Sequence, residues 1–144
     1  VGQGGAVAGG LAIKAAIVVA KPGALTHGKC AAIAVAGLTA LVSIEDTLQH
    51  AKGETILVQG GAGGVAGFAI QVAKHIGARV ITTASAANHD YVRKLGADQA
   101  IDYNKEDVAK VVSGVDAGFA TVGGATGRRP FAVFQPGGRA GGGC

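Results

Sequence analysis

The chain has 144 residues, of which 49% are hydrophobic and 26 are glycine, and its formal net charge is +4. This length allows one domain with a modest core of small aliphatic side chains. The basic residues are dispersed rather than interleaved with aromatic residues, so we expect no nucleic-acid partner. The longest apolar runs, such as Ala15 to Ala20 and Ala31 to Ala36, are far shorter than the ~20 residues of a membrane span. We therefore expect no membrane partner and, in the absence of a secretory signal pattern, a cytoplasmic protein.

From Ala51 onward, strand and helix patterns alternate along the chain. The apolar residues between Val65 and Ile76 recur at helical spacing, and Gly77 follows them as a helix-ending residue. The expected strands are Ile56 to Gln59, Arg79 to Thr83, Ala100 to Tyr103, Val115 to Val122 and a last strand after Gly138. The other expected helices are Asn88 to Leu95 and Lys105 to Ser113, the latter capped by Asn104. Such alternation predicts an α/β fold with a doubly wound parallel sheet and right-handed crossovers.

The stretch "VQGGAGGVAG", Val58 to Gly67, joins the first predicted strand to the first predicted helix. Within it, Gly61, Gly63 and Ala66 form the pattern G-x-G-x-x-A. At this place the first glycine allows a tight turn, the second admits backbone to a pyrophosphate, and the alanine permits close packing of helix and strand. Gly64 and Val65 open the helix, whose free N–H groups favour an anion. The pattern predicts a Rossmann-like dinucleotide site, although a glycine-rich turn can also be purely structural. No Lys-Ser or Lys-Thr pair follows, which excludes a P-loop.

Four ordered motifs carry a family resemblance, which runs from about Lys21 to Arg139. They are "VAGLTA" (Val35 to Ala40), "ETILVQGGAGGVAGFAIQVAKHIGARVITTAS" (Glu54 to Ser85), "KLGADQAIDYNKED" (Lys94 to Asp107) and "TVGG" (Thr121 to Gly124). Together they resemble the medium-chain dehydrogenase/reductase superfamily, and within it the zinc-independent quinone oxidoreductase branch.

The resemblance implies a domain organisation and a class of partner. Family members usually combine a GroES-like substrate domain with a Rossmann domain, and here the substrate domain is almost wholly absent. "LAIKAAIVVAKPG", Leu11 to Gly23, is similar to that domain's closing strand and linker. We therefore expect residues 1–23 to be a remnant of the substrate domain and residues 24–144 to be an incomplete Rossmann domain. A small-molecule carbonyl or quinone substrate is implied, and a family-like homodimer is possible.

Zinc divides this superfamily, and the sequence predicts no metal. Zinc-dependent relatives have Cys where Val35 stands, and valine cannot coordinate a metal. His27, His50, His75 and His89 lack the spacing of metal-binding pairs. For His50 and His75, ordinary surface or helix-face histidines are the better interpretation.

The end of the second predicted strand bears on the choice of cofactor. NAD enzymes usually place a carboxylate there to bind the ribose 2′-hydroxyl, whereas this chain has Thr83, Ala84 and Ser85. Ser85 could donate to a 2′-phosphate, and the resemblance puts His89 and Tyr103 near the same group. NADPH is therefore favoured over NADH. The alternative is a polar strand end with Tyr103 simply packing.

At the nicotinamide end, the resemblance implies Thr39 and the loop from Val122 through Gly123 to Gly124. Thr39 could instead only bond within a helix, and the two glycines could only turn the chain. No catalytic side chain is assigned, because the nicotinamide itself carries the hydride. The expected function is the NADPH-binding domain of a quinone or enone reductase. The alternative is a nucleotide-binding module without turnover, either a sensor or a truncated chain.

Overall fold

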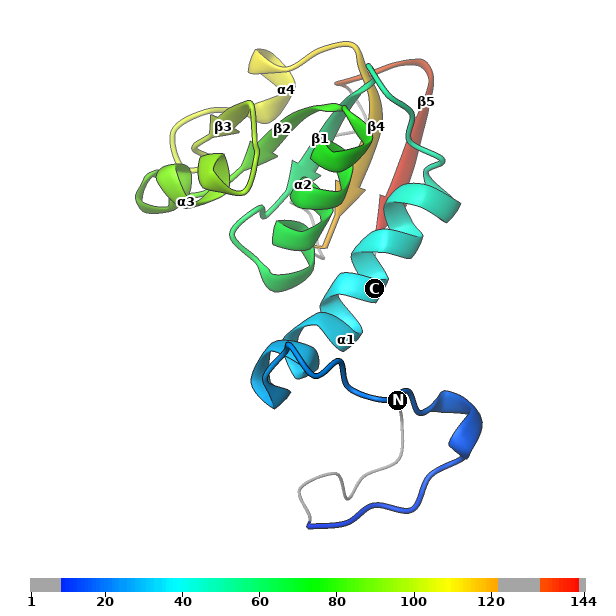
Figure 1. The fold of residues 1–144 in the computed structure, drawn as a ribbon. Helices are drawn as coiled ribbons and strands as arrows, with labels where there is room; N and C mark the ends of the chain where they lie inside the picture. The colour runs from blue at the N-terminus through cyan, green and yellow to red at the C-terminus, as the bar shows by residue number, and fades with distance from the viewer. Residues whose placement is uncertain (1–8, 122–132, 143–144) are drawn as a thin grey trace.

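A five-stranded parallel sheet in the order β3-β2-β1-β4-β5 forms the centre of the computed structural model, which describes residues 9–121 and 133–142 (Figure 1). The strands are β1 Thr55–Gln59, β2 Arg79–Thr83, β3 Gln99–Ile101, β4 Val115–Ala120 and β5 Phe134–Gly142. From β1 the chain moves outward to β2 and β3, and then returns to the other side of β1 as β4. The switch point of the topology, where α/β proteins bind ligands at the carboxyl ends of the strands, therefore lies between β1 and β4.

The helices are η1 Ala15–Ile17, α1 His27–Val42, the π-helical η2 Ser43–Thr47, α2 Gly64–Ile76, η3 Ala86–Asn88, α3 His89–Lys94 and α4 Val108–Val111. α1 begins at Thr26, whose side-chain oxygen accepts a hydrogen bond from the Lys29 N–H at 3.3 Å. α2 ends at Gly77, which has φ +96 and adopts the left-handed conformation typical of a helix C-terminus.

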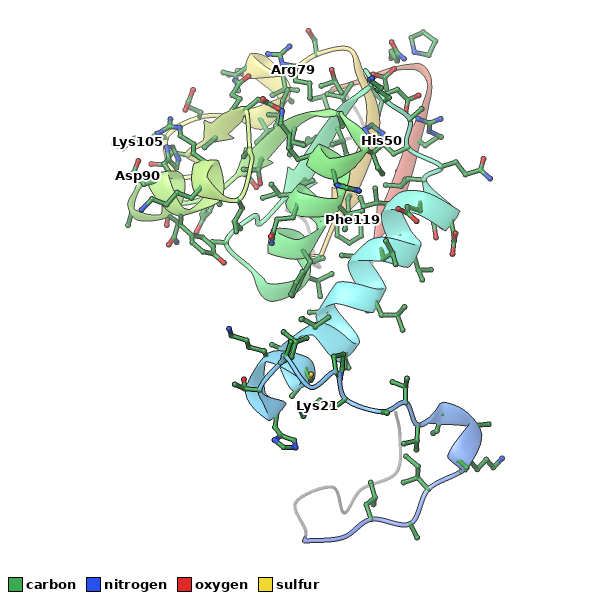
Figure 2. All side chains as sticks on the ribbon, in the orientation of Figure 1. Lys21, His50, Arg79, Asp90, Lys105 and Phe119 are labelled. Atoms are coloured by element: carbon green, nitrogen blue, oxygen red, sulfur yellow. The ribbon has the colours of Figure 1, made fainter. Side chains whose placement is uncertain are left out.

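Two hydrophobic clusters cover the two faces of the sheet. On one face, Ile56, Val58 and Val80 pack with the buried alanines of α2 and with residues of α1 and η2. Phe119 of β4 belongs to this cluster and is 1% exposed (Figure 2). On the other face, the alternate strand positions, Leu57 and Ile81 among them, pack with Val112, Val115 and Val133 and against α4. Both faces are buried because crossovers place helices on each side of a parallel sheet.

The predicted β-α-β-α-β order is confirmed, and β2 has the predicted bounds. β3 ends at Ile101, before the predicted Tyr103, and β5 begins at Phe134 rather than after Gly138. The prediction that Asn104 caps a helix from Lys105 is wrong. The amide and backbone N–H groups of Asn104 both donate to Asp102 Oδ1 at 3.1 Å, which forms a turn.

The cap of α4 is Asp107 instead. Its carboxylate accepts a hydrogen bond from the Ala109 N–H at 3.2 Å, and the helix is only four residues long. An Asp can serve either a turn or a helix cap. Asn104 therefore belongs to the turn, and Asp107 begins the helix.

Residues His27–Thr47 form a continuous stretch of 21 residues that is long and apolar enough to span a membrane by length and composition. The apolar runs within this stretch are short because single polar residues interrupt them without interrupting the helix. Core helices of globular proteins can have the same length and apolar composition. In this stretch, Ala40 and Ile44 are fully buried against the sheet layer. Other apolar side chains of α1 are exposed, including Val35 and Leu38.

The segment before α1 extends away from the sheet (Figure 1). Between Leu11 and Gly23 it contains the short η1, and its apolar side chains Ile17 and Val19 are 75% and 90% exposed. The strand character that the resemblance implies for this segment is not seen within residues 9–26. An extended segment gains ladder hydrogen bonds only beside another strand, and none of the five described strands lies next to it.

Candidate functional site

The turn between β1 and α2 is fastened to the end of β2. Gly60 has φ +65, and its N–H donates to the Thr83 hydroxyl oxygen at 2.9 Å. The Gly61 N–H donates to the Thr83 carbonyl at 2.9 Å, and the Gly63 N–H donates to the Gly60 carbonyl at 2.8 Å. Three backbone donors thus fix the path of the loop before the helix begins.

The glycines of this loop are required for different reasons. A Cβ at Gly61 would collide with the Thr82 hydroxyl, which itself donates to the Val58 carbonyl at 2.6 Å. A Cβ at Gly63 would lie 3.1 Å from the Gly60 carbonyl, whereas one at Gly64 would meet nothing within 4 Å. In this tight turn Gly60 adopts the left-handed conformation, and Gly61 is required by close packing.

Sequence reasoning missed the supporting role of Thr82 and Thr83. The signal that could have found it is a pair of threonines at the end of a buried strand, because adjacent strand residues point to opposite faces. One hydroxyl then reaches the β1 carbonyl and the other reaches the loop.

The N-terminus of α2 presents backbone N–H groups without a side-chain cap. Gly63 is the N-cap residue, no side chain accepts a hydrogen bond from this end, and the first turn carries no acidic residue. Ala62, Gly63 and Gly64 are exposed, whereas Ala66 is fully buried in the sheet-facing cluster, as predicted for close helix packing. Uncapped N–H groups and the positive end of the helix dipole suit an anion such as a pyrophosphate.

At the end of β2, Ser85 and His89 lie in one short network. The Asn88 amide donates to the Ser85 hydroxyl oxygen at 3.1 Å, and His89 Nε2 lies 3.2 Å from the Ala84 carbonyl. In the tautomer protonated at Nε2, that contact fixes the imidazole ring beside Ser85. Tyr103 follows β3 and is 54% exposed, so its side chain is not part of the core. Ser85 and His89 thus both lie within the short stretch that joins β2 to α3.

The residues predicted for the nicotinamide end are less completely described. Thr39 is half-buried on α1, which packs against α2, and it lies two residues from Gly37, where a Cβ would be 3.9 Å from Phe68 of α2. Val122 and Gly123 lie outside the described residues. The roles of all the predicted site residues in binding remain predictions.

Groups of three or more His, Cys, Asp or Glu side chains that could hold a metal ion are not found in residues 9–121 and 133–142. Val35, at the position where zinc-dependent relatives have Cys, is 58% exposed on α1. Independence from zinc remains a prediction that rests on the sequence.

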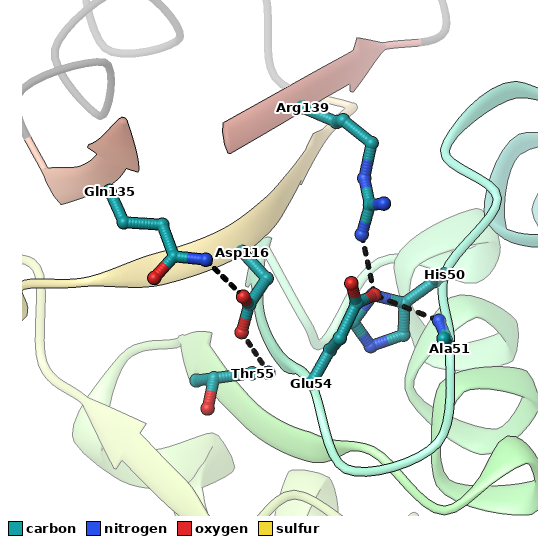
Figure 3. Close-up of polar contacts among 7 residues, drawn as sticks. All are labelled: His50, Ala51, Glu54, Thr55, Asp116, Gln135 and Arg139. Atoms are coloured by element: carbon teal, nitrogen blue, oxygen red, sulfur yellow. Dashed lines mark hydrogen bonds and ion pairs between the residues drawn. The ribbon is translucent and has the colours of Figure 1, made fainter. Parts of the chain in front are cut away.

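The opposite edge of the sheet, at the amino ends of β1 and β4, contains a polar cluster that the sequence did not predict (Figure 3). Glu54 Oε2 accepts hydrogen bonds from the Ala51 N–H at 2.8 Å and from Arg139 at 2.5 Å. Asp116 accepts from the Thr55 N–H at 2.8 Å and from the Gln135 amide. These contacts connect β5, β4 and the loop before β1.

His50 belongs to the same cluster, and its interpretation as a surface or helix-face histidine is wrong because the residue is only 6% exposed. Its Nδ1 lies 3.1 Å from Glu54 Oε2, but without hydrogen-bond geometry, and neither ring nitrogen has a hydrogen-bond partner among the described residues. Burial lowers the pKa of His50 below its ordinary value. The hydrogen bond from Arg139 lowers the pKa of the Glu54 carboxyl group.

Comparison with protein families identifies residues 64–141, more than half of the chain, as matching the family described as zinc-binding dehydrogenase. The 2-methylene-furan-3-one reductase of Solanum lycopersicum is 36% identical over 138 residues, which are 94% of this chain and 35% of that protein. The NADPH-dependent alkenal/one oxidoreductase of Arabidopsis thaliana, a chloroplastic protein, is 36% identical over 84% of this chain and 32% of its own length.

Among solved structures, the quinone oxidoreductase from Coxiella burnetii is similar to this chain with a TM-score of 0.81 and 37% sequence identity. The similarity covers 85% of this chain and 38% of that one, so the chain spans about a third of the length of such relatives. The fold and the glycine loop are consistent with the family that the comparison identifies. The chain therefore belongs to the zinc-binding dehydrogenase family of the medium-chain dehydrogenase/reductase superfamily, as a quinone oxidoreductase-like nucleotide-binding portion.

Proposed function

We propose that this chain is the NADPH-binding part of an oxidoreductase that transfers hydride to a quinone or an enone-type carbonyl substrate. The observation that carries the proposal is the uncapped N-terminus of α2, which opens beside the topological switch point between β1 and β4. Parallel α/β sheets bind ligands at this place, and a helix N-terminus there favours a pyrophosphate.

The glycine loop fits the group that it would hold. The hydrogen bonds from Gly60 and Gly61 to Thr83 fix the loop, and the bare backbone at Gly63 and Gly64 allows a phosphate to come close. The N–H groups at the start of α2 would bind the phosphate oxygens. When bound, NADPH supplies the hydride, and the protein contributes orientation and a polar site.

The preference for NADPH over NADH rests on charge at the end of β2. A carboxylate at this place would repel a 2′-phosphate, and Ala84 and Ser85 provide none. The Ser85 hydroxyl lies just after β2, the His89 ring lies at the start of α3, and the exposed Tyr103 ring follows the neighbouring strand. The hydroxyl groups of Ser85 and Tyr103 would supply hydrogen-bond donors to the 2′-phosphate.

The names of the relatives support the proposed substrate class. Their names describe reductions of a quinone, an alkenal or enone, and a methylene-furanone. Each of these substrates carries a carbonyl group conjugated with a carbon–carbon double bond. We propose an acceptor of the same chemistry for the intact protein.

A second candidate function is nucleotide binding without turnover. The chain spans about a third of the length of these relatives, so turnover is proposed for the whole protein rather than for these residues alone. Hydride transfer needs a substrate held against the nicotinamide with water largely excluded, and that requires a second wall to the site. Mass spectrometry of the native polypeptide distinguishes the two candidates. A mass well above 14.0 kDa supports the reductase, and a mass near 14.0 kDa supports the binding module.

Thermal unfolding of the 144-residue chain with NADPH or NADH tests the proposed binding directly. At about one hundred times its dissociation constant, a ligand stabilises the folded state by roughly 2.7 kcal/mol. We expect a clear shift with NADPH, a smaller shift with NADH at the same concentration, and no rapid quinone-dependent NADPH oxidation by this chain alone. A folded sample that shows no shift with NADPH would refute the proposal.

A further inference from the structure

Gln59 lies at the carboxyl end of β1, next to the switch point of the sheet. It is the last residue of β1, it precedes the glycine loop, and it pairs with Ala120 at the end of β4. The switch point lies between these two strands. A ligand that crosses the carboxyl edge from the β2 side to the β4 side therefore passes the end of β1 where Gln59 lies.

The side chain of Gln59 is buried and incompletely hydrogen-bonded. Gln59 is 6% exposed, and its Oε1 has no hydrogen-bond partner in the described part of the chain. The hydroxyl oxygen of Thr83, at the end of β2, already accepts from Gly60. Buried polar atoms in native proteins nearly always have a partner, so an unpaired buried acceptor indicates a missing donor.

The cofactor's chemistry limits where that donor can come from. The pyrophosphate presents only acceptor oxygens at neutral pH, and the 2′-phosphate end would lie near Ser85, on the β2 side. The nicotinamide half would lie on the β4 side, and it carries ribose hydroxyl groups and a carboxamide N–H₂. We propose that Gln59 Oε1 accepts a hydrogen bond from one of these donors and so fixes the nicotinamide half. This inference rests on the proposed function.

The test compares two ligands in the wild-type chain and in Gln59→Leu. NADPH contains the nicotinamide half, whereas adenosine 2′,5′-bisphosphate contains only the adenosine end. We expect Gln59→Leu to raise the dissociation constant of NADPH about tenfold, the size of one lost hydrogen bond, and to leave that of the bisphosphate within about twofold. We also expect the free variant to melt at a higher temperature than the wild type, because an unpaired acceptor has been removed.

Gln71→Leu is the matched control, since Gln71 is exposed on α2 and donates to the Gly67 carbonyl of its own helix at 3.1 Å. It should change neither dissociation constant by more than about twofold. If Gln59→Leu does not fold, Gln59→Met replaces it. If the variant binds NADPH as tightly as the wild type, or loses affinity equally for both ligands, the role assigned to Gln59 is overturned. The proposed function is not affected by either result. Absence of NADPH binding by the folded wild type would overturn the proposed function as well.

Discussion

The two edges of the sheet use polar groups in opposite ways. At the carboxyl edge, small residues leave the backbone bare, and the N–H groups at the start of α2 have no side-chain cap. At the amino edge, Glu54 and Asp116 accept hydrogen bonds from side chains and backbone of three different segments (Figure 3). The first edge keeps backbone N–H groups available to a ligand, whereas the carboxylates of the second edge form hydrogen bonds within the fold.

This difference explains how one short domain can hold an open anion site. The N–H groups at the start of α2 are exposed, so water can accept their hydrogen bonds in the free chain. The amino edge contributes stability through contacts between residues distant in sequence, such as Arg139 and Glu54. We therefore expect substitutions at the amino edge to change the free energy of unfolding, and those at the exposed carboxyl edge to change ligand affinity.

The largest effect on the free energy of unfolding is expected at Gly61. This glycine lies at the carboxyl edge, but it is closely packed. Gly61→Val would drive a side chain into Thr82 and Ile70, and should lower the free energy of unfolding by about 3 kcal/mol. Urea denaturation measures the loss. Gly64→Ala is the control, since its Cβ meets nothing within 4 Å, and it should unfold at the same or a higher urea concentration. A Gly61→Val chain as stable as the wild type would show that the loop is not closely packed.

Ser85→Asp should change affinity rather than stability. Ser85 is half-buried at the end of β2, whereas Ala84 is only 2% exposed and would bury the new carboxylate. Repulsion of the 2′-phosphate should weaken NADPH binding at least tenfold, or about 1.4 kcal/mol, with NADH much less affected. Isothermal titration calorimetry measures both constants, with Ser85→Asn as the neutral control. An unchanged ratio of the two constants would place the adenosine end elsewhere.

Glu54→Gln tests the amino edge. The substitution removes the charge that Arg139 contacts while keeping one oxygen acceptor, so the free energy of unfolding should fall by about 1 kcal/mol. The dissociation constant of NADPH should stay within about twofold of wild type, because the residue lies at the other end of β1 from the glycine loop. A weakened NADPH complex would mean that the two edges are coupled.

The smallest effect concerns pH. Because burial holds the pKa of His50 below its ordinary 6.5, the unfolded chain takes up this proton more readily, and stability falls as pH drops below about 6.5. The free energy of unfolding should fall by a fraction of the ~1.4 kcal/mol per pH unit that corresponds to the uptake of one proton on unfolding. Urea denaturation at pH 7.5 and 5.5 should show a smaller decrease for His50→Leu than for the wild type.

A second loss is expected at lower pH, where Glu54 titrates. Its pKa is held below the ordinary 4.5, so its contribution to stability is present above that pH and is lost as pH falls through the lowered value. His50→Leu should retain this lower step. Identical pH profiles for the variant and the wild type between pH 7.5 and 5.5 would contradict the assignment to His50.

The sequence by itself determined the parts of the molecule that depend on near neighbours. β1, α2 and β2 follow from apolar periodicity and from Gly77, and the glycine loop follows from its place between a strand and a helix. That the end of β2 selects the cofactor remains a prediction from the sequence. These features depend on residues within one β-α-β unit, so a local pattern contains the information.

Only the tertiary structure decided the contacts that join distant segments. Arg139 and Glu54 are separated by 85 positions, and Thr55 and Asp116 by 61, so no local pattern relates them. The burial of His50, the support of Gly60 by Thr83 and the unpaired oxygen of Gln59 arise in the same way. The physical reason is that sheet pairing sets which strand ends become neighbours, and burial then fixes whether a polar side chain finds a partner within the fold.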